Sequence, residues 1–218
     1  MVGRMAIVSP HRSDAQLLVL HGLRLKGIAE AHVLAERVGL DEPTVRQHLA
    51  EFEVSEQVRR RDGRLSGWSL TPAGRAENER MLRAELDDVD GRAVVSEQYE
   101  RFRSLNVDFL GLCTLWQLRD VEGNQVLNDH SDPRYDREIV ESLESMHAEA
   151  VPICDELRRL LQRFDRYRDR FGSALGRVRA GETDWFTKPI LDSYHTVWFE
   201  LHEDFLATLG MERSKEAS

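Results

Sequence analysis

The apolar positions in the first quarter of the chain recur at helical spacing in two short runs separated by a turn. Val45, Leu49 and Phe52 lie at i, i+4 and i+7, which places them on one face of a helix. Gly39 can end the preceding helix in a left-handed conformation, which costs glycine least. Asp41 is a suitable N-cap for the second helix. The pattern therefore predicts a helix-turn-helix.

A two-stranded hairpin is predicted after the second helix. Residues 57–61 and 65–71 are the expected strands, and an Asp-Gly pair at 62–63 is a strong hairpin turn signal. Thr71 is the expected N-cap of a further helix whose first residue is proline. A short strand near Ile28 is expected to join the same sheet.

The second half of the chain reads as three long helical patterns. Apolar residues share one face over 95–116, alternate in steps of four and three over 139–171, and form a third stripe in a helix over about 192–209. The middle pattern is a heptad seam five repeats long. Pro152 within it predicts a kink or a break, because proline cannot donate to the helical ladder. Residues 119–134 are polar and are expected to form a loop.

These elements predict a mainly α fold with two domains. We expect a flexible N-terminus over 1–13, a winged helix-turn-helix over 14–86 and an all-helical domain over 92–218, with the acidic segment 87–91 as linker. The wing is expected to be the only sheet.

The N-terminal pattern resembles the winged-helix regulators of the MarR type, and its second helix is also similar to that of the ArsR type. The matching residues are Ala35, Gly39, Val45, Leu49, the Asp62-Gly63 turn and the WSLTPAGR segment at 68–75. The resemblance covers about residues 14–86. It implies a dimeric, cytoplasmic, bacterial-type transcription regulator that responds to a small molecule.

Two groups of side chains are candidates for contact with double-stranded DNA. Thr44, Arg46 and Gln47 lie on the outward face of the second helix and are types that hydrogen-bond base edges in the major groove. The hairpin carries a cluster of arginines, whose forks suit phosphates. These arginines are Arg59, Arg60, Arg61 and Arg64.

One feature of the same helix argues against DNA. Glu51, Glu53 and Glu56 follow one another at its end and would repel the phosphate backbone if they faced it. Winged helices also dock on proteins. A protein-interaction module is therefore the alternative to a DNA-binding regulator.

The net charge of −9 seems unfavourable for a DNA-binding protein until it is divided along the chain. Residues 1–86 hold 13 basic and 12 acidic side chains, whereas residues 87–218 hold 17 and 27. The local field decides contact with phosphates. The acidic excess of the second half therefore does not exclude DNA as a partner.

The second domain carries candidate ligand-binding residues but no recognisable catalytic motif. Trp116, His147, Tyr194 and His195 lie on or beside apolar stripes, which makes them candidates for lining a ligand cleft. No nucleophile elbow, phosphate-binding glycine loop or paired-carboxylate pattern is present. We therefore expect no enzyme activity and no cofactor.

Four histidines leave a metal site open as a further alternative. His130, His147, His195 and His202 could serve a helical metal- or ligand-binding protein whose winged helix does not bind DNA. Their order and spacing match poorly those of the metal-binding helical domain of GntR-type regulators, so they are interpreted as capping and core-edge residues and no metal is assigned.

Cysteine usage and hydropathy bear on the location of the protein. Cys113 and Cys154 suggest neither a disulfide framework nor a zinc site and are expected to be buried free thiols. No apolar run approaches the length needed to span a membrane, and no signal peptide is recognisable. A cytoplasmic protein without a membrane contact is expected.

The heptad seam also bears on assembly, because such seams pair helices within one chain or between two. The seam and the last helix carry more apolar surface than three helices readily cover, and two half-sites on DNA favour two chains. We expect a homodimer. A small effector in a cleft of the second domain would then shift the population of DNA-competent dimers.

Overall fold

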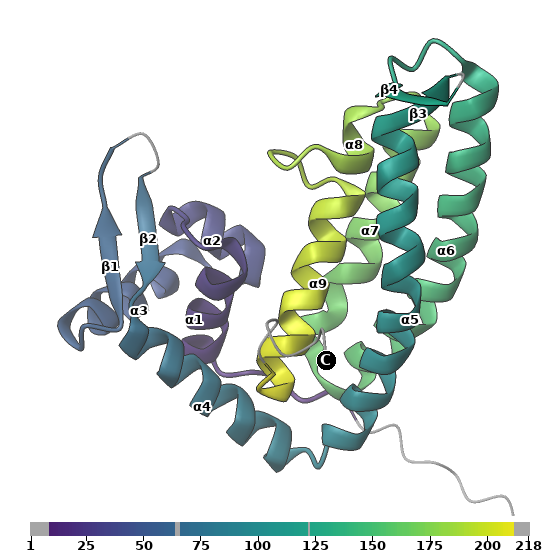
Figure 1. Cartoon of the computed structure of the whole chain (residues 1–218). Coiled ribbons are helices and arrows are strands. Elements are labelled where there is room, and N and C mark those ends of the chain that lie inside the picture. Colours follow the sequence, from purple (N-terminus) through teal and green to yellow (C-terminus); the bar gives the residue numbers. More distant parts are fainter. Residues whose placement is uncertain (1–8, 64–65, 122, 212–218) are drawn as a thin grey trace, which may run out of the picture. The chain divides into compact units, whose positions relative to one another are not determined.

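The structure is a computed structural model that describes residues 9–63, 66–121 and 123–211 (Figure 1). The chain divides into two compact units, and neither is one continuous stretch of sequence. Within the described residues, the first unit comprises 9–92, 158–163 and 203–211, and the second unit comprises the rest. The expected contiguous domains at 14–86 and 92–218 therefore describe the organisation only in part.

Helices and one hairpin make up the N-terminal stretch of the first unit (Figure 1). In chain order these elements are α1 (Ala15–Lys26), α2 (Ala31–Val38), α3 (Glu42–Val54), β1 (Val58–Arg61), β2 (Gly67–Leu70) and α4 (Pro72–Asp88). The turn between α2 and α3 follows the predicted spacing: Gly39 has a φ of 74°, and the Asp41 carboxylate accepts a hydrogen bond from the Thr44 N–H (2.9 Å).

The core of the first unit forms where the apolar stripes of these helices meet. Val45, Leu49 and Phe52, the predicted stripe of α3, are buried in one cluster with Leu20 and Leu34. This burial fixes which side of α3 faces solvent. Residues of α3 between these three are left on the outside.

The hairpin is antiparallel, with a register that runs from Val58 opposite Leu70 to Arg61 opposite Gly67. The strands Val58–Arg61 and Gly67–Leu70 are shorter than the predicted 57–61 and 65–71, and residues 64 and 65 between them lie outside the described residues. The strand expected near Ile28 is present as a single bridge one residue later, where Ala29 and Trp68 exchange two backbone hydrogen bonds (3.0 and 2.8 Å).

The second unit is built mainly of helices (Figure 1). Its elements are α5 (Arg92–Gln117), β3 (Leu118–Val121), β4 (Asn124–Leu127), α6 (Pro133–Leu160), η1 (Gln162–Phe164), α7 (Asp165–Arg179), α8 (Asp184–Thr187) and α9 (Tyr194–Leu209). The last residues of α6 and of α9 belong to the first unit. The predicted last helix corresponds to α9.

A second hairpin corrects the expectation that the wing is the only sheet. β3 and β4 pair antiparallel from Leu118 opposite Leu127 to Val121 opposite Asn124, within the segment expected to be a loop. The second half of the chain is therefore mainly helical but not all-helical. Each strand has only four residues and β4 is exposed throughout, so no alternation of buried and exposed positions marked it.

Pro152 does not break α6, so the prediction of a break is wrong, whereas that of a kink stays a prediction. The helix continues through this residue to Leu160. A proline removes only one donor from the ladder, and its neighbours Ala150 and Ile153 are buried on the seam. The heptad pattern instead continues from α6 into α7, and the chain turns between these two helices at residues 161–164.

The heptad seam pairs helices within this chain. Its members are buried without a second copy of the protein: Ile139, Leu143, Met146, Ala150, Ile153, Leu157, Phe164, Tyr167 and Phe171. Ion pairs from Asp155 to Arg168 and from Glu144 to Arg179 show that α6 and α7 run antiparallel. The seam therefore no longer supports the expectation of a homodimer.

The N-terminal segment is more ordered than predicted where it is described. His11 exchanges backbone hydrogen bonds with Leu160 (3.0 Å) and Gln162 (2.9 Å) of the same unit. The expected flexible tail therefore does not extend to His11. Residues 1–8 lie outside the described residues.

Candidate functional site

The exposed face of α3 carries the three side chains predicted for the major groove. Arg46 and Gln47 are exposed, and Thr44 is half-buried beside the N-cap. The Thr44 hydroxyl donates to Asp41 (Oγ1 to Oδ2, 2.8 Å). Hydrogen bonds from the backbone and the hydroxyl of Thr44 hold the pKa of Asp41 below its usual value. Thr44 therefore donates to the N-cap Asp41 of its own helix, and its hydroxyl retains mainly acceptor capacity.

Arg46 and Gln47 each have an acidic partner one turn away. Arg46 Nε donates to Glu42 (2.8 Å) and Gln47 Nε2 donates to Glu51 (2.9 Å). The bond from Gln47, followed by that from His48, lowers the pKa of Glu51. Exposed pairs at this spacing contribute little to stability. A base edge or a phosphate could therefore replace the acidic partner at small cost.

The arginines of β1 differ in their surroundings. Arg60 lies over the Trp68 ring (5.8 Å from Cζ to the ring centre), and its guanidinium comes within 3.9 Å of Glu30 and 3.6 Å of Asp62. This side chain is held against the hairpin by a ring and two carboxylates. Its charge is partly compensated before any ligand arrives.

Arg59 and Arg61 present their charge to solvent instead. Both are exposed, and neither forms an ion pair with another residue in the described part of the chain. Their partners across the hairpin are Ser69 and Gly67, which have a small side chain or none. Arg64, the fourth predicted arginine, lies outside the described residues.

The C-terminal end of α3 is acidic and exposed. Glu51 and Glu53 occupy its last turn, and Glu56 follows with a φ of 56°. The basic strand β1 therefore follows directly after an acidic helix end. Any phosphate backbone that meets β1 must avoid this end or lose affinity.

A buried network of charged side chains, which no sequence pattern predicted, joins distant segments of the first unit. Arg163 is its centre and donates to Glu85 (2.9 Å), to Asp204 and to Thr208 (2.7 Å). His21 Nε2 lies 3.1 Å from Asp204. The four titratable side chains are at most 5 % exposed.

Charge compensation sets the protonation state of this network. Burial alone would raise the pKa of Asp204, but the charges of Arg163 and His21 outweigh burial and hold this pKa well below its usual value. Asp204 is therefore ionised at neutral pH. Arg163 binds the carboxylates of both Glu85 and Asp204. The network therefore links α1, α4 and α9.

Tyr194, one of the four predicted ligand residues, lies inside an aromatic cluster of the second unit. Its side chain is fully buried, with its ring centre 5.7 Å from that of Phe109 and 4.8 Å from that of Phe171. The hydroxyl lies 3.4 Å from Nδ1 of His147. Burial raises the pKa of Tyr194, which keeps the phenol protonated.

His147 and His195 are only partly buried beside this cluster. Burial lowers the pKa of both side chains, and it acts together with Arg179 and Arg168 at His147. Both imidazoles are therefore expected to be neutral at pH 7. Neither they nor Tyr194 line the pocket described next.

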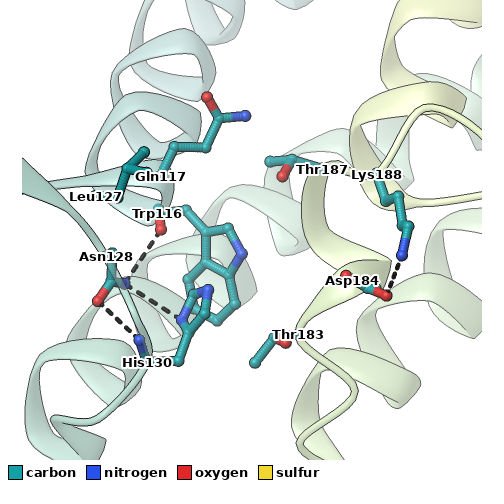
Figure 2. Close-up of a pocket in the computed structure, with 9 residues that line it drawn as sticks. All are labelled: Trp116, Gln117, Leu127, Asn128, His130, Thr183, Asp184, Thr187 and Lys188. Atoms are coloured by element: carbon teal, nitrogen blue, oxygen red, sulfur yellow. Dashed lines mark hydrogen bonds and ion pairs between the residues drawn. The ribbon is translucent and has the colours of Figure 1, made fainter.

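A pocket of about 290 Å³ opens in the second unit between the end of α5, the residues after β4 and the segment of α8 (Figure 2). One wall consists of Trp116, Gln117, Leu127, Asn128 and His130. The opposite wall consists of Thr183, Asp184, Thr187 and Lys188. Of the four predicted ligand residues, this pocket contains Trp116 alone.

Contacts on several sides fix the orientation of Trp116. The rings of Phe186 and His130 each lie with their centres 4.6 Å from that of the indole. Asn128 Nδ2 donates to the Trp116 carbonyl (3.1 Å) and to Asp136 (2.9 Å), and His130 Nδ1 lies 3.0 Å from Asp136. Figure 2 shows the indole nitrogen on the edge that faces the opposite wall.

The residues of the opposite wall were missed by sequence reasoning. They lie on or beside α8, a helix of only four residues, so they show no periodicity. His130 was noted only as a possible metal ligand in a polar loop. The nearest sequence signal was the position of Trp116 at the end of a long amphipathic helix.

The described residues bear on two further kinds of site. No group of three or more His, Cys, Asp or Glu side chains suited to a metal ion occurs among them. Within the same residues, every helix is too short or too polar to cross a lipid bilayer. Cys113 and Cys154 are free and buried, as predicted, and burial raises the pKa of both thiols to about 12.

Comparisons of the whole chain with family models, with curated proteins and with solved structures find no match.

Proposed function

We propose that the elements α1 to α4 form a winged helix-turn-helix that binds double-stranded DNA, and that the protein is a transcription regulator of the cytoplasm. The observation that carries this proposal is the pair of exposed, uncompensated guanidiniums of Arg59 and Arg61 on β1, next to a helix whose outward face carries Arg46 and Gln47. Phosphate contacts supply most of the affinity of such proteins.

Each element has a separate role in the proposed complex. Arg59 and Arg61 hold phosphates and set the register of the protein on the duplex. Arg46 and Gln47 give up their hydrogen bonds to Glu42 and Glu51 and bind base edges in the major groove. Arg60 supports the hairpin through Trp68 and contributes less to binding. Because base contacts replace existing partners, the sequence preference is expected to be modest.

A homodimer is proposed on the basis of an apolar stripe on α5. Val107, Leu110 and Leu115 are 72, 51 and 49 % exposed, although they lie on a well-formed helix. Gly111 and Thr114 lie between them at i, i+3 and i+4 spacing, where small side chains would allow a second helix to approach. We name these five residues the α5 stripe. Two copies joined through it would read two half-sites.

The acidic character of α3 favours a second candidate, a protein-interaction module. Glu42 and Glu51 already hold Arg46 and Gln47, and Glu53 is exposed. Such a surface would suit a basic segment of a partner protein. The hairpin would then only support the helix.

Selection of bound duplexes from a random DNA pool at 0.1 M salt separates the two candidates. A DNA-binding regulator enriches sequences with a common motif, repeated as an inverted pair if the protein is dimeric. Recovery of duplexes at background level from the intact protein would refute DNA binding and leave the interaction module. A non-specific binder would retain DNA without enriching any motif.

A further inference from the structure

We infer that the pocket at Trp116 binds a small zwitterion of the free amino acid type. Its carboxylate would lie between the indole Nε1 of Trp116 and the ammonium group of Lys188, and its own ammonium group would lie toward Asp184. This inference goes beyond DNA binding and rests on the proposed transcription regulator only for its regulatory meaning. Binding itself requires only the second unit.

Three polar groups of the pocket have no hydrogen-bond partner among the described residues. They are the indole Nε1 of Trp116 and the hydroxyls of Thr183 and Thr187 (Figure 2). An indole N–H can only donate, whereas each hydroxyl can donate and accept. A ligand therefore needs an acceptor oxygen on the side of Trp116, and a carboxylate supplies the strongest one.

The opposite wall is bipolar. Lys188 Nζ donates to Asp184 Oδ2 over 2.6 Å, and both side chains line the pocket. An ammonium group has three donors and a carboxylate about four acceptor sites, so each retains capacity for a ligand. Because the pair is exposed, its bond is worth little and is readily rearranged.

This pair selects between classes of ligand. A ligand with a single charge gains energy from one partner and loses it against the other, because the two charges lie side by side. A zwitterion gains from both. The pocket should therefore prefer molecules with both charges to simple acids and simple amines.

Size and ring packing narrow the class further. A cavity of about 150 Å³ holds benzene, so 290 Å³ accommodates a molecule with a moderate side chain. Phe186 and His130 already pack on the Trp116 ring, and Trp116 is only 4 % exposed. A flat aromatic ligand cannot stack on the indole. Recognition must use its edge.

Calorimetric titration of the full chain with the twenty free amino acids, without DNA, tests the inference. For each amino acid that binds, the N-acetyl derivative lacks the positive charge and the carboxamide lacks the negative one. Both should bind at least about tenfold more weakly than the parent. If no amino acid binds at 10 mM, or if the derivatives bind as well as the parent, the inference is wrong.

Variants of the bipolar pair locate the bound charges. Asp184→Asn should abolish the preference for the parent amino acid over its N-acetyl derivative. Lys188→Gln should abolish the preference for the parent over its carboxamide. Trp116→Phe removes the indole donor, and Thr187→Val is a second test in case that variant folds poorly. Both should weaken every zwitterion.

Glu182→Gln is the matched control. Glu182 is also an exposed carboxylate in an ion pair, with Arg177 (3.0 Å), but it does not line the pocket. The affinity of this variant for each amino acid should equal that of the native chain. An equal loss in Glu182→Gln and Asp184→Asn would overturn the proposed site. Because no DNA is present, failure here leaves the DNA-binding proposal unaffected, and the reverse also holds.

Discussion

The arginines of the hairpin are not equivalent, although the sequence presents them as one cluster. Arg60 is drawn toward Trp68 and Glu30, because the strand alternation turns it to the other face from Arg59 and Arg61. Residue type and position predicted a basic hairpin. They could not predict which guanidiniums remain uncompensated, since Glu30 is distant in sequence.

Replacement of Arg59 and Arg61 together by alanine should reduce the salt dependence of DNA binding by about two units of slope, because two phosphate contacts are lost. Arg60→Ala should change the slope by less. Fluorescence anisotropy on selected DNA at several salt concentrations measures both. Arg137→Ala is the control, since Arg137 is exposed on α6 of the second unit. A slope equal to the native value in the double variant would contradict the proposed contacts.

Asp204 should stabilise the protein in a pH-dependent manner. Its pKa in the folded protein lies below the unfolded value of about 3.9, so its contribution is complete above that pH and is lost as the pH falls toward the folded pKa. Asp204→Asn leaves Arg163 short of one buried partner and should cost about 3–5 kcal/mol at pH 7. The difference from the native chain should narrow below about pH 4.

Urea unfolding at pH 7 and at pH 3 measures this effect. Glu144→Gln serves as the control, because Glu144 pairs with Arg179 at the surface and should cost less than about 1 kcal/mol. A loss in Asp204→Asn no larger than that of the control would show that the buried network is not stabilising. The network escaped sequence reasoning because Glu85 and Asp204 lie 78 and 41 residues from Arg163.

At the scale of elements, local signals worked where a cap or a stripe is contained in a few residues. Asp41 and Thr71 were predicted as N-caps, and both accept a backbone hydrogen bond there. The β3–β4 hairpin and α8 were not predicted, because strands and helices of four residues are too short to show a period. The break expected at Pro152 is absent, because a helix of 28 residues packed along its length tolerates one missing hydrogen-bond donor.

The cap of α3 should be worth measurable stability. Asp41→Ala removes the acceptor of the Thr44 N–H and should measurably lower the free energy of unfolding. Asp14 precedes α1 in the same position but its side chain accepts no capping bond. Asp14→Ala should therefore cost clearly less in the same chemical denaturation. Equal losses would show that the Asp41 side chain does not act as a cap.

At the scale of the whole molecule, the apolar seam is not evidence for the expected dimer. The periodicity of residues 139–171 predicted helix pairing, but no sequence pattern distinguishes pairing within a chain from pairing between chains. The aromatic residues of α9 and α5 provide the internal partners, with Trp198 stacked on Phe109 at 4.4 Å. Part of the exposed apolar surface of the second unit lies instead on the α5 stripe.

Sedimentation equilibrium at micromolar concentration should give twice the mass of the 25.2 kDa chain. Leu110→Glu places a charge at the centre of the α5 stripe and should yield a monomer that remains folded. Ile190→Glu, at a residue that is 90 % exposed and does not belong to the α5 stripe, should leave the dimer intact. A native chain that sediments as a monomer would contradict the proposed homodimer.

The interleaved composition of the first unit limits how this protein can be divided. Arg163, Asp204 and the backbone partners of His11 come from the second half of the chain, although they complete the core of the proposed DNA-binding unit. Expression of residues 1–91 alone would leave Glu85 and His21 buried without their partners. The proposed winged helix is therefore not a transferable module here. Transfer of this unit to another protein would have to carry two distant segments along, which makes recombination of whole domains a poor route to new specificities for this architecture.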